Sequence, residues 1–151
     1  GAAVALGAGA KAGGDLYVAG RAGARSWKLG IRHPREPAEI IATYEVRRDM
    51  AVVTSGDYER FFVHQGHRYH HILDPRTGWP AAGLVSVTLF ASTGLDADAL
   101  CTGVFVLGLE KGLELVERLA DVDAVLIDEA GRIHVSSGMQ GSVEVLGSFT
   151  P

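Results

Sequence analysis

Glycine, proline and short polar turns interrupt the first ninety or so residues of the chain every few positions, and the runs between them are short. Such runs, when rich in β-branched and aromatic side chains, predict strands, because Gly and Pro end regular structure while Val, Ile, Thr and Tyr favour a pleated backbone. The predicted strands are residues 16–18, 27–31, 40–47, 51–54, 60–64, 67–73, 85–90, 124–127, 133–135 and 143–146. Those at 60–64 and 67–73 flank the turn pair Gln65-Gly66 and predict a β-hairpin.

Two helical stretches follow the strand at 85–90. Residues 95–107 carry Ala, Leu, Val and Phe on nearly every side, so we expect a helix buried all round that ends at Gly108. In residues 110–119 apolar side chains recur at intervals of three with Glu and Arg between them, which predicts an amphipathic surface helix. Many short strands with two helices predict an α+β fold with a mostly antiparallel sheet.

Composition excludes several classes of function. A chain of 151 residues with 47% hydrophobic residues is expected to be one globular domain with its own core. The net charge of -4 and the absence of a Lys/Arg block argue against a nucleic acid or an anionic membrane surface as partner. The longest apolar stretch, residues 100–109, is too short to span a bilayer, and residues 1–9 lack the charged start of a signal peptide.

Asp98 and Thr102 stand four residues apart in the predicted apolar helix, so they project from one face of it. One interpretation is local: Asp96 or Asp98 accepts hydrogen bonds from the first helical turn, and Thr102 donates to a backbone carbonyl. The other is a site for a hard cation, because Mg²⁺ takes carboxylate, hydroxyl and phosphate oxygens and keeps waters elsewhere. The pair alone leaves both interpretations open.

Histidines gather in and beside the predicted hairpin. A structural zinc site would need four convergent ligands and no cysteine lies nearby, so we expect surface or hydrogen-bonded roles for His64 and His67. Alternation along the strand places His67 and His71 on one side and His70 on the other. His71 enters a turn directly, where it can act as an acid or base near neutral pH or donate to a phosphate.

The turn itself carries an acid and two possible donors to an anion. Pro75 and Gly78 fix a tight turn after Asp74, and Arg76 and Thr77 between them are placed to donate hydrogen bonds.

Three ordered motifs resemble those of the FAD:protein FMN transferase family, the ApbE-type flavin transferases. They are Ser-Gly-Asp-Tyr-Glu-Arg-Phe-Phe at residues 55–62, Arg-Tyr-His-His-Ile-Leu-Asp-Pro-Arg-Thr-Gly-Trp-Pro at 68–80, and Asp-Ala-Leu-Cys-Thr at 98–102. Gly-Gly-Asp at 13–15 resembles the opening of a strand in the same family, and residues 27–31 resemble the strand after it. The resemblance covers most of residues 13–148.

The resemblance implies an α+β fold of the type called a T-fold. It also implies a Mg²⁺-dependent reaction in which FAD is cleaved at its pyrophosphate, FMN passes to a threonine hydroxyl of an acceptor protein, and AMP leaves. By the family pattern Asp98 and Thr102 bind the metal together with the backbone carbonyl of Ala10. His71, or Asp74 beside it, would position or deprotonate the attacking hydroxyl. The residues expected to bind the nucleotide are Gly14, Asp15, Ser55, Gly56, Arg76 and Thr77.

Residues 4–12 resemble a family segment that normally lies a helix and a strand before the Gly-Gly-Asp turn, whereas here the two almost abut. Members of the family are also longer than this chain. We therefore expect residues 1–151 to be a single flavin-transferase-like catalytic domain that is truncated at its N-terminus. We also expect that a segment is missing near residues 12–13.

Two alternatives share the same site residues. With water in place of the acceptor, the site would be a Mg²⁺-dependent FAD pyrophosphatase that yields FMN and AMP. A domain that binds flavin without turnover is the other alternative. The resemblance implies the bacterial cell envelope or periplasm as location, with the cytoplasm as the alternative, and we expect FAD and a threonine-bearing flavoprotein as partners.

Overall fold

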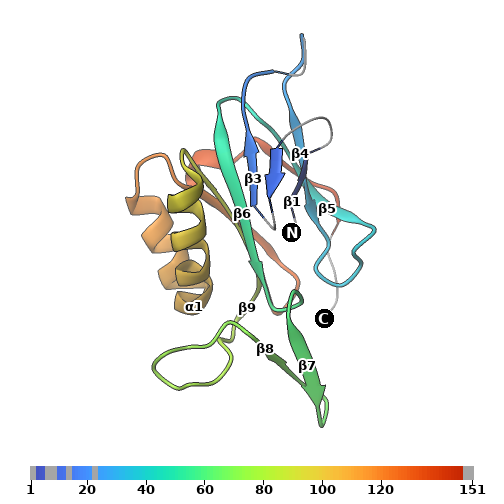
Figure 1. Cartoon of the computed structure of the whole chain (residues 1–151), viewed down its shortest axis with the longest axis vertical. Coiled ribbons are helices and arrows are strands. Elements are labelled where there is room, and N and C mark those ends of the chain that lie inside the picture. The colour runs from blue at the N-terminus through green and yellow to red at the C-terminus, as the bar shows by residue number, and fades with distance from the viewer. Residues whose placement is uncertain (1–2, 6–9, 13–14, 22–23, 148–151) are drawn as a thin grey trace.

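The computed structural model describes residues 3–5, 10–12, 15–21 and 24–147, and Figure 1 shows how their elements are arranged. The strands are β1 (Ala3–Ala5), β2 (Ala10–Ala12), β3 (Asp15–Val18), β4 (Lys28–Arg32), β5 (Ile40–Glu45), β6 (Met50–Gly56), β7 (Phe61–His64), β8 (His67–His70), β9 (Leu84–Ala91), β10 (Asp123–Asp128), β11 (Ile133–Val135) and β12 (Val143–Val145). The helical elements are α1 (Gly94–Arg118) and a short 3₁₀ turn, Ser137–Met139.

In the described part of the chain the strands form three sheets. A six-stranded sheet has the order β11-β10-β9-β6-β3-β2, a four-stranded sheet has the order β1-β4-β5-β12, and β7 and β8 pair with each other. Each of these pairings is antiparallel. The α+β class and the antiparallel sheet predicted from the short strands are confirmed.

The six-stranded sheet is the middle layer of the fold, with α1 on one face and the four-stranded sheet on the other (Figure 1). In β6, Met50 and Val52 pack into the apolar cluster between the two sheets, while Ala51 and Val53 pack into the cluster beneath α1. Successive side chains of a strand point to opposite faces, so a middle strand must be apolar at nearly every position. This explains why all of β9 is buried.

One face of α1 packs on the middle sheet, so the expectation of a helix buried all round is wrong. The side chains buried against the sheet are those of Ala97, Cys101, Val104 and Phe105. Leu95 is 80% exposed, and Asp98 and Thr102 are exposed on the flank of the helix. Ala99 and Gly103 are also exposed, and such small residues raise the apolar content of a helix without requiring burial.

Gly108 interrupts α1 with φ 78° and ψ -177°, a backbone conformation that a side chain would strain. The predicted end of the first helix at this residue is therefore confirmed, and a second helical segment continues to Arg118. Among the described residues, no helix combines the length and the apolar character that crossing a bilayer requires.

β1 and β2 fall in a Gly/Ala-rich stretch for which the sequence predicts no strand, because Ala and Gly have little preference for extended structure. The predicted strands at 16–18 and 27–31 are present, but they lie in different sheets as β3 and β4.

The β7–β8 hairpin projects from the body of the fold (Figure 1). Its turn is the predicted Gln65-Gly66 pair, with φ 50° and 78°, and all four residues of β7 are exposed. The predicted second strand, 67–73, ends at His70, because the chain turns there toward the helix side of the sheet.

Candidate active site

A pocket of about 350 Å³ opens where four parts of the fold meet: the end of β6, the start of β3, the first turns of α1 and the base of the β7–β8 hairpin. Its lining includes six residues that the sequence proposes for the site, namely Asp15, Ser55, Gly56, His71, Asp98 and Thr102. The antiparallel pairing of β3 with β6 and the packing of α1 over β6 bring them together from distant parts of the chain.

Thr102 reaches from the helix to the sheet. Its hydroxyl oxygen lies 3.2 Å from that of Ser55, the penultimate residue of β6. Thr102 therefore bonds across the pocket and not to a carbonyl of its own helix, which is what the local interpretation expected. Two hydroxyls and the carboxylate of Asp98 face one pocket as a result.

Asp96, and not Asp98, completes the start of α1. Thr93 is the N-cap: its hydroxyl accepts from the backbone amide of Asp96 and donates to the Asp96 carboxylate at 2.6 Å. This reciprocal capping satisfies the first turn of the helix. Asp98 lies two residues further along the helix, where it is exposed in the lining of the pocket.

Cys101 anchors the buried side of the same helical turn. Its thiol lies 3.3 Å from the carbonyl oxygen of Val87 and 3.5 Å from that of Val53, and burial raises its pKa to about 11. A thiol held in this way is a packing residue and not a nucleophile.

His71 and His70 have opposite roles, as strand alternation predicts. His71 is exposed in the pocket, and its Nδ1 lies 3.3 Å from the carbonyl oxygen of Arg60. A carbonyl can only accept, so Nδ1 carries the proton and Nε2 of the neutral ring is left able to accept one. His70 is buried, with its Nε2 3.0 Å from the carbonyl oxygen of Ala81, and serves the core.

The turn after His71 is braced by its own residues and does not line this pocket. Arg76 donates to both carboxylate oxygens of Asp74, and these hydrogen bonds lower the pKa of Asp74 and raise that of Arg76. Thr77 donates to the carbonyl of Asp74 and accepts from the amide of Trp79. The structure thus does not bring Asp74, Arg76 or Thr77 to His71.

The remaining proposed residues lie near the N-terminus. In the register of β2 with β3, Ala12 pairs with Asp15 and Ala10 pairs with Tyr17. Ala10 is therefore two pairs, roughly 7 Å, along the strand from the pair of Ala12 with Asp15. Gly14 lies outside the described residues.

Glu59 and Arg60 also line the pocket, although the sequence assigned them no role. Both belong to the motif at residues 55–62, and their position directly after Ser55 and Gly56 was the available signal. Packing against Tyr58 requires a glycine at position 56, since a Cβ on Gly56 would lie 2.5 Å from a ring carbon of Tyr58. Burial of that ring raises the pKa of Tyr58 to about 12.

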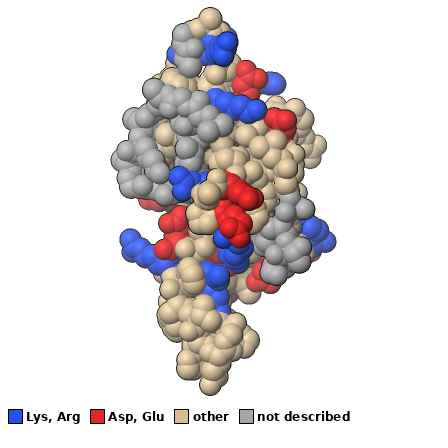
Figure 2. Space-filling model, turned by 90° about the vertical axis from the view of Figure 1, so that its right-hand side faces the viewer, with Lys and Arg blue, Asp and Glu red and all other residues tan. Residues whose placement is uncertain are grey.

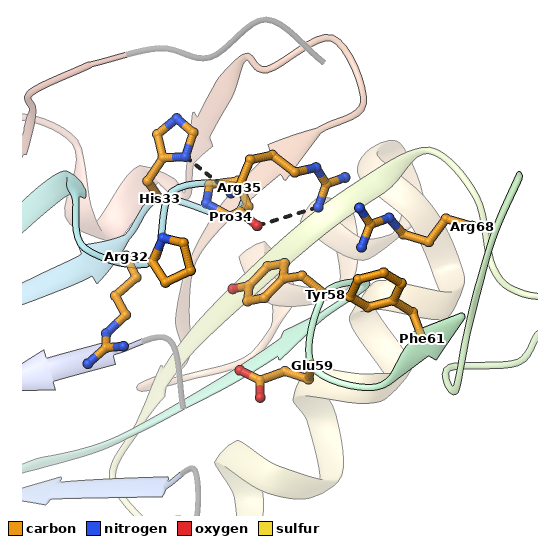
Figure 3. A pocket seen from close by; sticks show the side chains of 9 residues that line it. Arg32, His33, Pro34, Arg35, Tyr58, Glu59, Phe61 and Arg68 are labelled. Carbon is orange, nitrogen blue, oxygen red and sulfur yellow. Dashed lines mark hydrogen bonds between the residues drawn. The ribbon is translucent and has the colours of Figure 1, made fainter. Parts of the chain in front are cut away.

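A second pocket of about 370 Å³ lies beside the first and shares Glu59 with it. Figure 3 shows the side chains of Arg32, Arg35 and Arg68 around Tyr58 and Phe61 in this pocket. The guanidinium of Arg68 lies 3.8 Å from the centre of the Phe61 ring, a cation–π contact. Arg35 makes a two-pronged ion pair, donating to the carboxylate oxygens of Asp57 at 2.6 and 2.8 Å.

The chain also matches known proteins over most of its length. Residues 7–126 match the model of a protein family described as the ApbE family. The chain belongs to the ApbE family.

Curated relatives of this ApbE-family chain carry the name FAD:protein FMN transferase. The one from Treponema pallidum (strain Nichols) is 47% identical over 121 residues, which cover 80% of this chain and 33% of that protein. The one from Klebsiella pneumoniae (strain 342) is 37% identical over 126 residues, which cover 83% of this chain and 38% of that protein. The chain thus spans little more than a third of the length of these relatives.

Solved ApbE structures share the fold. The ApbE protein of Thermotoga maritima superposes with a TM-score of 0.78 at 37% identity, over 89% of this chain and 44% of that one. The flavin transferase ApbE of Vibrio cholerae gives a TM-score of 0.70 at 28% identity, over 87% of this chain and 43% of that one.

Proposed function

We propose that this chain takes part in the Mg²⁺-dependent transfer of FMN from FAD to a threonine hydroxyl of an acceptor protein, with release of AMP. The observation that carries the proposal is the meeting of Asp98, Thr102 and His71 in one open pocket. The name of the relatives, FAD:protein FMN transferase, supports three parts of the proposal: the transfer of a flavin, FAD as its source and a protein as its acceptor. The metal and the threonine rest on the motif resemblance and on the chemistry of the pocket.

The oxygen atoms of the pocket fit a magnesium ion. Asp98 offers a carboxylate, and Thr102 and Ser55 offer hydroxyls 3.2 Å apart. In the described residues no three His, Cys, Asp or Glu side chains gather into a metal cluster. Mg²⁺ needs no such cluster, because it is commonly held by one or two carboxylates with substrate phosphates and waters. When bound, the ion would neutralise charge on the pyrophosphate.

His71 is the base in this proposal. The hydrogen bond from its Nδ1 to the Arg60 carbonyl orients the ring and leaves Nε2 to take the proton of the acceptor hydroxyl. The hydroxyl oxygen then attacks the phosphorus of the FMN half. The bond from that phosphorus to the bridging oxygen breaks, and the bridging oxygen leaves with AMP. Positioning and charge neutralisation supply most of the rate in such a displacement.

Arg60 adds a positive charge to the same pocket. Its guanidinium can donate to phosphate oxygens in a way that the acidic lining residues Asp15 and Glu59 cannot. We expect Arg60 to hold the pyrophosphate next to the metal, in the place the sequence interpretation gave to Arg76.

Hydrolysis of FAD is the second candidate function, and the exposure of His71 favours it. A water molecule can reach Nε2 of this exposed ring as readily as a threonine hydroxyl can. The products would then be FMN and AMP with no labelled protein.

The test incubates the chain with FAD and Mg²⁺, with and without a threonine-bearing acceptor peptide, and measures FMN adducts and AMP by mass spectrometry. Asp98→Asn should abolish metal-dependent turnover, because the only charged metal ligand is lost. Asp96→Asn is the matched control: it removes an equal charge from the same helical turn but leaves the pocket and the Asp96 amide intact. Equal activity in the two variants would refute the metal site, and FAD binding without AMP release would identify a non-catalytic flavin-binding domain.

A further inference from the structure

The exposed aromatic side chains of the β7–β8 region form a surface next to the candidate active site. Phe62 is 63% exposed and Trp79 is 64% exposed, and both contact Tyr69. The rings of Phe62 and Tyr69 stack with their centroids 5.1 Å apart and 9° between their planes, and the Trp79 centroid lies 6.1 Å from that of Tyr69. We call these three side chains the aromatic face. Contiguous exposed aromatic surface of this kind is typical of interaction sites.

Strand register makes the aromatic face continuous with the active-site pocket. Phe62 pairs with Tyr69 in the hairpin, and one hydrogen bond beyond the assigned strands, from the amide of His71 to the carbonyl of Arg60 at 3.1 Å, continues the same register. Residues two apart in a strand share a face. Arg60 and His71, which line the pocket, therefore lie on the same side of the hairpin as Phe62 and Tyr69.

The opposite face of the hairpin belongs to the other pocket. Phe61 and Arg68 line the neighbouring arginine-rich pocket, where Arg68 stacks on Phe61. The hairpin thus separates the aromatic face from the arginine-rich pocket, and His71 lies on the same side as the aromatic face.

The charge of the hairpin indicates what kind of partner it suits. From Arg60 to Leu73 the sequence contains two arginines and four histidines but no Asp or Glu, in a chain whose net charge is -4. Figure 2 shows the projecting end of the molecule free of both acidic and basic colour, with Lys or Arg and also Asp or Glu side chains above it. On the side of the aromatic face the hairpin carries Arg60, His64, His67 and His71, whereas Arg68 lies on the opposite face. An apolar surface bordered by these hydrogen-bond donors suits a partner that is apolar and acidic.

We propose that the aromatic face is the docking surface for the acceptor polypeptide, which lies extended along the hairpin with its threonine at His71. This rests on the proposed transfer of FMN to a protein, because that reaction requires a polypeptide to reach an open and polar pocket. Phe62 is two residues from Arg60, so an extended segment would place an apolar side chain on the aromatic face roughly 7 Å from the threonine, two residues away. Acidic residues of the segment would lie toward Arg60 and the hairpin histidines.

The test uses short synthetic peptides with one threonine and a leucine two positions from it, flanked either by aspartates or by lysines. Binding is followed by the fluorescence of Trp79 in a Trp27→Phe background, and FMN transfer by mass spectrometry. Phe62→Ser should weaken binding of the acidic peptide and raise its KM at least about 10-fold, as loss of a central aromatic contact does. Cleavage of FAD without peptide should be unchanged.

Val63→Ser is the matched control, because Val63 is the next residue, is 59% exposed and lies on the opposite face of the hairpin. Val63→Ser should leave FAD cleavage, FMN transfer and peptide binding unchanged. Equal loss in the two variants, equal binding of the lysine peptide, or a fall in FAD cleavage by Phe62→Ser would overturn the proposal. A change in oligomeric state with Phe62→Ser would assign the face to a second copy of the chain instead.

Failure of the proposed function gives a different result. In that case the wild-type chain neither cleaves FAD nor labels a peptide, whether or not peptide binding depends on Phe62.

Discussion

The hydroxyl oxygens of Ser55 and Thr102 lie 3.2 Å apart although the two residues are 47 positions apart in the chain. One residue before Thr102, the thiol of Cys101 contacts the carbonyl of Val53, two residues before Ser55. Neighbouring residues of the helix thus meet the same face of β6, one within the buried core and one near the end of the strand, where the pocket opens. The buried contact fixes the height of the helix over the sheet, and the exposed one brings two oxygen atoms to the position proposed for the metal.

Replacing Thr102 by valine tests whether its hydroxyl serves the reaction. Thr102→Val keeps the shape of the side chain, and because the residue is exposed the free energy of unfolding should change by less than about 1 kcal/mol. Mg²⁺-dependent cleavage of FAD should fall at least about 10-fold, since one metal ligand is lost, whereas Thr102→Ser should retain most of it. Wild-type turnover in the valine variant would leave Thr102 with a packing role only.

Local pattern was sufficient to predict the strands from β3 to β12, the Gln65-Gly66 turn and the helix break at Gly108, because each depends on residues within a few positions. It was not sufficient for the burial of α1. The exposed positions of that helix include Leu95, Ala99, Gly103 and Leu107, so composition suggested a helix buried all round where tertiary packing buries one face.

The structure likewise brings together some of the residues that the sequence proposes for the site and keeps others apart. Asp15, Ser55, Gly56, His71, Asp98 and Thr102 meet as the motifs indicate. Sequence proximity alone had associated Asp74, Arg76 and Thr77 with His71. In the fold Arg76 and Thr77 bond to Asp74, and short-range bonds of this kind satisfy a turn before any ligand is present. Ala10 depends on strand register, which no local pattern specifies.

A comparison of Asp74→Ala with His71→Ala tests which residue is the base. His71→Ala should lower kcat for FMN transfer by about 10²–10⁴, the usual contribution of a general base, with little change in Tm. Asp74 holds Arg76 and the turn at residues 74–78, so Asp74→Ala should lower Tm and affect kcat less. Steady-state kinetics and thermal unfolding of both variants give the answer. A larger loss of kcat with Asp74→Ala would return the catalytic role to Asp74.

Acid stability should depend on Asp128, the last residue of β10, which does not line the proposed site. Burial alone would raise the pKa of its carboxyl, but hydrogen bonds from His134 and from the backbone and side chain of Arg132 hold the pKa at about 2, below the ordinary 3.8. A depressed pKa in the folded state means that the stabilisation is complete above the unfolded pKa and is lost as the pH falls through the folded one.

The variant Asp128→Asn cannot titrate, so it should be less stable than the wild type by about 1–3 kcal/mol near neutral pH. That difference should shrink as the pH falls from 3.8 toward about 2. Urea unfolding at a series of pH values measures it. A difference that stays constant across this range would show that the hydrogen bonds of Asp128 do not depend on its charge.

Gly56→Ala and Gly103→Ala form a matched pair for the packing of the pocket wall. A Cβ at Gly56 would lie 2.5 Å from a ring carbon of Tyr58, whose hydroxyl is bonded to Ser86 at 3.2 Å, so the ring cannot move away without losing that bond. Gly56→Ala should therefore lower the free energy of unfolding by about 1–3 kcal/mol and disturb the adjacent Ser55. Gly103 is exposed on α1 with nothing within 4 Å of an added Cβ, so Gly103→Ala should be neutral or stabilise the fold by up to about 1 kcal/mol. Chemical denaturation of the two variants separates steric crowding from backbone entropy, and a Gly56→Ala variant as stable as the wild type would mean that Tyr58 can move.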